Sequence, residues 1–160
     1  MRYTFDLGRW GKLGAQWVMT LYDRADQVPL PGEATLDLLG IAGGSTIDQG
    51  YIERMGNLAL NYSRGKFNAT WTSRFVGSAE MAFGTREAGF PGIGSKSYHA
   101  LRLGYAFREG SEIFVGANNL FDEDPPFFCS GCSGTQALDS IPGYYDIFGL
   151  SYYAGARLRF

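Results

Sequence analysis

A strict two-residue alternation in the final segment, residues 150–160, constrains the fold more than any other feature of this chain. One set of alternate residues is Leu150, Tyr152, Ala154, Ala156, Leu158 and Phe160, and the other is Ser151, Tyr153, Gly155, Arg157 and Arg159. Successive side chains of a β-strand point to opposite faces, so this segment would have one apolar face and one polar face. A dyad repeat that ends on an aromatic residue is typical of a strand between lipid and water. We therefore expect a membrane β-strand here.

Six further segments show a similar pattern and are about as long as a tilted membrane strand, which needs roughly 9 to 11 residues. They are residues 2–7, 12–21, 57–63, 66–75, 101–108 and 113–121. The last of these is apolar on both faces near its start, so its register stays open. The sequence predicts an all-β chain with about seven antiparallel strands.

The connections between these segments alternate between short and long. Tight, glycine-containing turns are expected at residues 8–11, 64–65 and 109–112, whereas residues 24–54, 78–97 and 122–149 form long connections rich in Pro, Gly and Asp. Outer-membrane barrels combine short periplasmic turns with long extracellular loops. The alternation therefore favours a transmembrane β-barrel segment, with every short turn on the periplasmic side.

Composition limits the other classes of function. The 160 residues suit one domain, and 45% apolar with 19% charged residues is typical of a folded chain. No uninterrupted apolar run has the roughly 18 residues of a spanning helix. The net charge of −2 and the lack of a basic cluster interleaved with aromatic residues argue against binding to nucleic acid.

An isolated set of seven strands is an incomplete barrel. Two strand edges would remain unpaired in lipid, and an odd antiparallel count makes the closing pair parallel. Residues 1–6 also enter the first alternating segment without the apolar core of a signal peptide. We expect the chain to be the carboxy-terminal segment of a larger barrel, whose other part is either a separate chain or lost by truncation.

Two motifs near the end of the chain resemble the end of TonB-dependent outer-membrane receptors. The first is Asn-Asn-Leu-Phe-Asp-Glu-Asp-Pro-Pro-Phe at 118–127, and the second is Tyr-Asp-Ile-Phe-Gly at 145–149, followed by a strand that ends in Phe160. Leu150 departs from the family pattern, which often has Arg after that glycine. The resemblance implies that residues 1–160 are part of a 22-stranded barrel whose plug domain lies outside this sequence.

The resemblance also implies a function and partners. Such receptors take up scarce solutes (iron chelates, cobalamin or saccharides) across the outer membrane of Gram-negative bacteria with energy supplied through TonB. The expected partners are outer-membrane lipid, the remaining strands and plug of the parent receptor, TonB through that plug, and the barrel-assembly machinery through Phe160 in the last strand. The transported solute is not identified by the sequence.

Two cysteines, Cys129 and Cys132, lie close together in the last long connection. In an exported chain such a pair suggests a small structural disulfide. A redox site would need a helix start to lower a thiol pKa, and a tetrahedral zinc site would need two ligands besides the pair, more than the single His99 supplies. We therefore expect a disulfide and neither a metal nor another cofactor.

The long connections also contain candidate ligand contacts. The aromatic candidates are Phe127, Phe128, Tyr144 and Tyr145, with Phe148 nearby. Their rings could stack on a sugar or a chelate, or anchor the connection at the membrane interface. The acidic residues of the same connection could attract a cationic or metal-bearing solute, or form a solvated outer face; they are Asp122, Glu123, Asp124, Asp139 and Asp146.

Four arginines are expected to face the lumen, where they would pair with plug carboxylates or attract anionic solutes. They are Arg74, Arg102, Arg157 and Arg159. Catalysis is not expected, because His99 has no serine or carboxylate at a triad spacing. The glycine-rich segment 89–97 misses a P-loop by one residue and opens no helix.

Two other classes of protein remain open at this point. One is a passive porin or a barrel enzyme, although an enzyme should show a nucleophile, a base and an orienting group. The other is a self-contained soluble β-sandwich that serves as a binding module. A sandwich predicts buried Trp17, Trp71 and Phe75, whereas the barrel predicts that these side chains face lipid.

Overall fold

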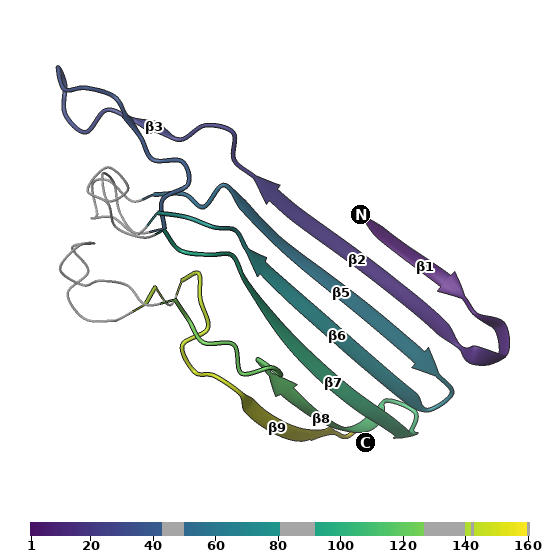
Figure 1. Ribbon diagram of the computed structural model, residues 1–160. Coiled ribbons are helices and arrows are strands. Elements are labelled where there is room, and N and C mark those ends of the chain that lie inside the picture. The colour runs from purple at the N-terminus through teal and green to yellow at the C-terminus, as the bar shows by residue number, and fades with distance from the viewer. Residues whose placement is uncertain (43–49, 81–91, 127–139, 142, 160) are drawn as a thin grey trace.

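The chain forms one large antiparallel β-sheet and a small hairpin (Figure 1). The computed structural model describes residues 1–42, 50–80, 92–126, 140–141 and 143–159. Among these residues, no helix is long and apolar enough to cross a bilayer. The seven strands of the sheet, in spatial order, are β1 (Arg2–Asp6), β2 (Lys12–Leu21), β5 (Arg54–Arg64), β6 (Phe67–Val76), β7 (Lys96–Arg108), β8 (Ser111–Asn118) and β9 (Ser151–Arg157).

The structure confirms an all-β fold and a strand at each of the seven predicted segments. The observed strand bounds differ most at β7, which begins five residues before the predicted 101, and at β8, which ends at Asn118. The chain leaves β8 because Asn119 adopts a φ of 46°, which interrupts an extended strand. The open register of this strand is now fixed, since Val115 pairs with both Leu103 and Ala154.

Short turns lie at one end of the sheet and long connections at the other (Figure 1). The β1–β2 turn contains a short 3-10 helix, η1 (Gly8–Trp10), and Gly11 follows it with a φ of 98°. A side chain at Gly11 would also overlap the carbonyl oxygen of Ser63 on β5. The first long connection contains the small hairpin of β3 (Asp26–Gln27) and β4 (Leu36–Asp37).

Strand pairing aligns the alternating residues into two chemically different faces. One row of paired residues crosses all seven strands on the apolar face and consists of Tyr3, Ala15, Leu60, Trp71, Leu101, Ala117 and Tyr152. A row on the polar face consists of Thr4, Gly14, Asn61, Thr70, Arg102, Gly116 and Tyr153. Every pairing in this sheet is antiparallel. Because side chains alternate between the faces with a period of two residues, a one-residue slip of any strand would move its apolar side chains to the polar face.

No second sheet covers the apolar face in the described part of the chain. Trp17 is 50% exposed, Leu103 47% and Val115 54%. The sandwich hypothesis required a buried Trp17, which the structure does not have. Trp71 and Phe75 are partly buried, by their neighbours within the same sheet.

The buried apolar core lies at the end of the sheet that has the long connections. It contains Ala42, Ile52, Val76, Ala79, Ile93, Tyr98 and Tyr145. Isolated bridges tie the connections together, with Ile41 paired to Glu80 and Ala79 paired to Ile93. The described parts of the long connections therefore pack against one another and against Val76 of β6 and Tyr98 of β7. We call these parts of the connections the loop layer.

Candidate functional site

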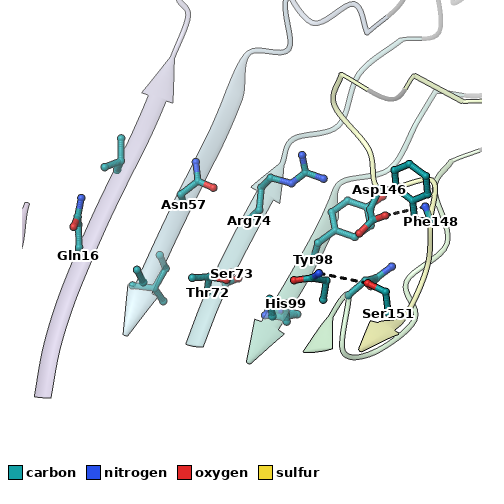
Figure 2. Close-up of a pocket in the computed structure, with 16 residues that line it drawn as sticks. Gln16, Asn57, Thr72, Ser73, Arg74, Tyr98, His99, Asp146, Phe148 and Ser151 are labelled. Carbon is teal, nitrogen blue, oxygen red and sulfur yellow. Dashed lines mark hydrogen bonds between the residues drawn. The ribbon is translucent and has the colours of Figure 1, made fainter. Parts of the chain in front are cut away.

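The polar face contains a hollow of about 720 Å³ near the loop layer (Figure 2). Six strands and the β8–β9 connection contribute polar side chains to it, and these include Gln16, Asn57, Thr72, Arg74, Tyr98, Asn118, Asp146 and Ser151. Register explains the arrangement, because residues at the same level of neighbouring antiparallel strands share one face. The lining also includes apolar side chains such as Val18, Leu58 and Phe148, so the hollow offers a mixed surface with room for part of another molecule or domain.

Arg74 supplies the positive charge of this hollow. Its guanidinium carbon lies 5.0 Å from the centre of the Tyr98 ring, a cation–π contact. Tyr98 is only 6% exposed, so the guanidinium of Arg74 packs on a buried ring while Arg74 itself lines the hollow. Arg74 thus lies on the polar face, in a hollow that Asp146 also lines.

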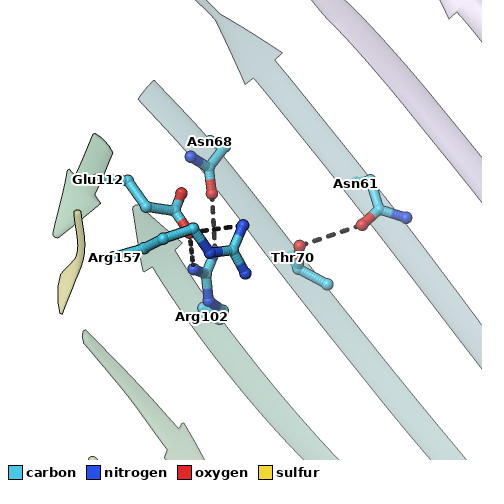
Figure 3. A network of polar contacts seen from close by, with 6 residues as sticks. All are labelled: Asn61, Asn68, Thr70, Arg102, Glu112 and Arg157. Carbon is cyan, nitrogen blue, oxygen red and sulfur yellow. Dashed lines mark hydrogen bonds and ion pairs between the residues drawn. The ribbon is translucent and has the colours of Figure 1, made fainter. Parts of the chain in front are cut away.

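A second polar cluster lies nearer the short turns (Figure 3). Arg102 donates to Asn68 Oδ1 at 3.1 Å and to Glu112 Oε1 at 2.5 Å, and it lies 4.3 Å from the centre of the Phe114 ring. Arg157 is 3.9 Å from the same Glu112 oxygen. The side chains of Arg102 and Glu112 are 27% and 17% exposed, which makes this pair better shielded than a surface ion pair.

The two arginines of this cluster differ in how much charge they still offer. Glu112 neutralises Arg102, whereas the side chain of Arg157 remains 74% exposed. Arg159, the fourth predicted residue, follows β9 and extends over the β7–β8 turn, where its backbone nitrogen donates to Ser111 Oγ at 3.0 Å. Arg74 and Arg157 are therefore the better candidates for contact with an anionic partner on this face.

Sequence reasoning missed Glu112 and Asn68 because their roles depend on neighbouring strands. Glu112 is the second residue of β8 and Asn68 the second residue of β6, and both reach Arg102 on β7 across the sheet. The available signal was the polar set of each strand. It shows that these residues share a face with Arg102, but it does not give the pairing register.

Two glycines of the polar face lie under aromatic rings. The Tyr153 ring covers Gly116, and the Phe114 ring covers Gly155, so a Cβ atom at either glycine would overlap the ring. The two rings meet edge to face at 6.3 Å. These glycines let the rings lie against the backbone between β8 and β9.

The Asn-Leu-Phe-Asp motif has a clear structural role. Asn119 is 3% exposed and exchanges two hydrogen bonds with the backbone of Glu123, at 2.9 and 3.0 Å. Asp122 Oδ1 accepts a 2.8 Å hydrogen bond from the backbone nitrogen of Leu150, which joins the exit of β8 to the entry of β9. Lys96 also pairs with Glu123 at 2.5 Å. The motif therefore fixes the ends of the last long connection.

The Tyr-Asp-x-x-Gly motif at 145–149 lies beside the hydrogen bonds of Asn119 and Asp122, which together we call the clamp. Asp146 Oδ1 accepts a hydrogen bond from the backbone nitrogen of Phe148 at 2.9 Å, and Gly149 has a φ of 70°. A side chain at Gly149 would approach Asp122 Oδ1. The two motifs that gave the family resemblance are therefore in direct contact and shape one turn.

The predicted aromatic ligand contacts fall in different environments. Tyr145 is 1% exposed, and burial raises the pKa of its hydroxyl to about 12. Tyr144 is partly buried and donates to the carbonyl oxygen of Gly50 at 3.4 Å; burial first, and then Tyr22 and Tyr51, raise its pKa. Tyr145 thus supports the loop layer in this structure, whereas Tyr144 lies closer to its surface.

Several predicted residues lie outside the described part of the chain. They are Phe127, Phe128, Cys129, Cys132, Asp139 and Phe160. The predicted disulfide, the two phenylalanine ligand contacts and the terminal assembly signal therefore stay predictions.

His99 has an aromatic environment. Its ring centre lies 5.2 Å from those of Trp71 and Phe121, at the loop end of the apolar face. Within the described ranges, no group of three or more His, Cys, Asp and Glu residues is arranged to hold a metal ion. These contacts give His99 a packing role beside the apolar face.

Comparisons with protein-family models, with curated proteins and with solved structures find no match to this chain.

Proposed function

We propose that this chain is part of the β-barrel of a TonB-dependent receptor in the outer membrane of a Gram-negative bacterium. The observation that carries the proposal is the continuous exposed apolar face opposite a continuous polar face. Large apolar side chains remain half exposed or more along this face, from Tyr3 on β1 to Tyr152 on β9, and an extended exposed apolar surface marks a membrane or protein contact. In a membrane, lipid would cover it, and the sheet already satisfies the backbone hydrogen bonds between its strands.

The two edges of the sheet support a larger barrel. β1 and β9 each have one unpaired side, and the antiparallel order makes them run in the same direction (Figure 1). An antiparallel closure therefore needs an odd number of additional strands between them. The 15 that would complete a barrel of about 22 strands meet this condition.

On this proposal the polar face lines the lumen. Arg74 and Arg157 would contact carboxylates of a plug domain, Arg102 would stay neutralised by Glu112, and Arg159 would remain over the β7–β8 turn. The long connections would lie outside the cell and contribute to a mouth that binds a scarce solute, an iron chelate, cobalamin or a saccharide. TonB would act through the plug, and the assembly machinery would recognise the final strand with Phe160. Binding and transport need no bond cleavage, so we propose no enzymatic activity and no cofactor.

Lipid contact is tested with single-tryptophan variants of the full chain in vesicles of phosphatidylcholine brominated in its acyl chains. Trp17 and Trp71 lie on the apolar face and Trp10 lies in the β1–β2 turn, so mid-chain bromine should quench Trp17 and Trp71 more strongly than Trp10. Equal, weak quenching of all three, together with a cooperative folded monomer in detergent-free buffer, would contradict the proposal.

Energised transport is tested in cells that produce the complete receptor with or without residues 1–160. The probes are ferric citrate, cobalamin and maltotriose in labelled form. Accumulation of one probe that requires this segment and stops with a protonophore supports active uptake. Accumulation that persists with the protonophore would instead assign the chain to a passive porin.

A further inference from the structure

The three long connections differ sharply in charge from the rest of the chain. Residues 22–53, 77–95 and 119–150 contain thirteen of the sixteen acidic residues and only two of the fourteen basic ones. The acidic residues are Asp23, Asp26, Glu33, Asp37, Asp48, Glu53, Glu80, Glu87, Asp122, Glu123, Asp124, Asp139 and Asp146, and the basic ones are Arg24 and Arg86. A surface with this balance repels anions and slows their approach. The loop layer is therefore poorly suited to an anionic solute.

The loop layer also has a separate polar pocket of about 390 Å³. It forms where β2 ends, where β3 begins and where the chain approaches β5, and it is lined by Tyr22, Arg24, Ala25, Asp26, Gln27, Leu38 and Tyr51. Its volume is within the range of small-molecule sites. Residues of the 720 Å³ hollow do not line it, so it is a different site.

Backbone hydrogen bonds hold the walls of this pocket. The nitrogen of Tyr22 donates to the carbonyl oxygen of Glu53 at 2.9 Å, and that of Tyr51 donates to Leu38 at 3.0 Å. Leu38 in turn donates to Ala25 at 2.9 Å and is 1% exposed. Three segments that are distant in sequence are thus joined around a buried leucine, and the pocket is built into the fold.

Two tyrosine rings form one side of the pocket. The ring centres of Tyr22 and Tyr51 are 5.6 Å apart and their planes are tilted by 55°. Tyr22 is 37% exposed and Tyr51 45%, so both rings remain available to a ligand. After burial, these two tyrosines also contribute to the raised pKa of the neighbouring Tyr144. Exposed, tilted aromatic faces suit a molecule with a flat C–H surface.

The charged groups of the pocket compensate each other. Arg24 Nε donates to Asp26 Oδ2 at 2.5 Å, and the two side chains form an ion pair. The carboxylate of Asp26 therefore neutralises the positive charge of Arg24, which would otherwise attract an anion. The pair still offers both hydrogen-bond donors and acceptors to a ligand. Gln27 adds an amide to the same wall.

We infer that this pocket binds a neutral saccharide; the inference rests on the proposed function and names its solute class. A sugar ring combines C–H faces that stack on Tyr22 and Tyr51 with hydroxyl groups that pair with Arg24, Asp26 and Gln27. The acidic connections exclude anionic chelates of similar size. On this inference the loop layer selects neutral solutes over anionic ones.

The inference is tested by saturation-transfer NMR and calorimetric titration on the full chain in detergent micelles. The neutral probes are maltotriose, xylotriose and chitotriose, and the anionic probes are trigalacturonic acid and ferric citrate. At least one neutral probe should bind, with transfer from tyrosine ring protons, while the anionic probes do not. Binding of the anionic probes in preference to all three neutral ones would overturn the inference.

Variants locate the binding site. Tyr22→Ala and Tyr51→Ala should each weaken binding of the neutral probe about tenfold, which corresponds to the upper end of a single aromatic contact. Tyr152→Ala removes a tyrosine from the apolar face of β9 and should leave binding unchanged. Tyr51→Phe is the control for misfolding: it keeps the aromatic ring and should retain most of the affinity for the neutral probe. Unchanged binding in both alanine variants would overturn the site.

The charge pattern has its own test. Asp26→Asn releases Arg24 from its ion pair and should increase binding of trigalacturonic acid relative to the neutral probe. Failure of the saccharide inference remains distinguishable from failure of the proposed function, because bromolipid quenching of Trp17 and Trp71 does not depend on the solute. Saccharide binding without lipid contact would retain this inference and overturn the membrane proposal.

Discussion

The apolar face of the sheet and the core of the loop layer use similar residues in opposite ways. Leu103 and Val115 on the sheet are about half exposed, whereas Ile52 and Leu38 in the loop layer are 0% and 1% exposed. The loop layer buries its side chains against other protein segments, and its stability is therefore intrinsic. The sheet face has no protein partner in the described residues, so its stabilisation depends on what surrounds it.

The largest expected effect is a core truncation. Ile52→Ala leaves a cavity in the loop layer and should cost about 2 to 5 kcal/mol in the free energy of unfolding. Leu103→Ala removes a half-exposed side chain and should cost less than about 1 kcal/mol in detergent, because detergent fills the space. Urea titration followed by tryptophan fluorescence measures both. Equal losses of unfolding free energy in the two variants would mean that the loop layer and the apolar sheet face do not differ in burial.

Charge substitution on the sheet face should be almost as disruptive, but only in lipid. Leu103→Arg should destabilise the folded chain by about 2 to 4 kcal/mol in vesicles, the cost of an arginine at the bilayer midplane. Val18→Arg is the matched control and should have little effect, because Val18 is also about half exposed but lies on the polar face opposite the neutral Asn57. Refolding yield in vesicles, followed by heat-modified gel mobility, compares them. A similar loss in both variants would remove the distinction between the faces.

Alkaline pH should weaken the loop layer before the sheet. The pKa of Tyr145 is about 12 in the folded chain and its ordinary value is 10, so the unfolded chain releases this proton first. The stabilisation is fully present below pH 10 and is lost as the pH rises to about 12, by roughly 2 kcal/mol. Tyr145→Phe should flatten this dependence between pH 10 and 12. Thermal unfolding across that range in both proteins is the measurement, and parallel curves would contradict it.

The smallest of these effects concerns the clamp, the hydrogen bonds of Asn119 and Asp122 where the sheet joins the last long connection. Asn119→Ala removes two hydrogen bonds and places alanine at a φ of 46°, which should cost about 1 to 2 kcal/mol. Asn119→Gly removes the same hydrogen bonds but relieves the backbone strain, and it should cost less than the alanine variant. Protease cleavage in the last long connection should increase in the same order. A glycine variant as unstable as the alanine variant would show that the backbone conformation contributes nothing.

The sequence alone determined the strands, their faces and the ends at which turns and long connections meet. A two-residue period is a local property, because each side chain of a strand alternates whatever the strand pairs with. Residues 12–21 therefore predicted β2 without knowledge of β5, and the glycine-containing segments predicted the tight turns. The motifs at 118–127 and 145–149 were visible in the sequence, but the hydrogen bonds of Asn119 and Asp122 that join the ends of the last long connection were not predicted.

Only the tertiary structure decided which polar groups meet. Arg102 pairs with Glu112 and Asn68 because antiparallel register brings three strands together, and Tyr22 meets Tyr51 because a long connection returns beside its own start. Tyr145 is buried although its sequence context resembles that of Tyr144. These contacts depend on residues far apart in the chain, and alternation gives the face of a residue but not its neighbours.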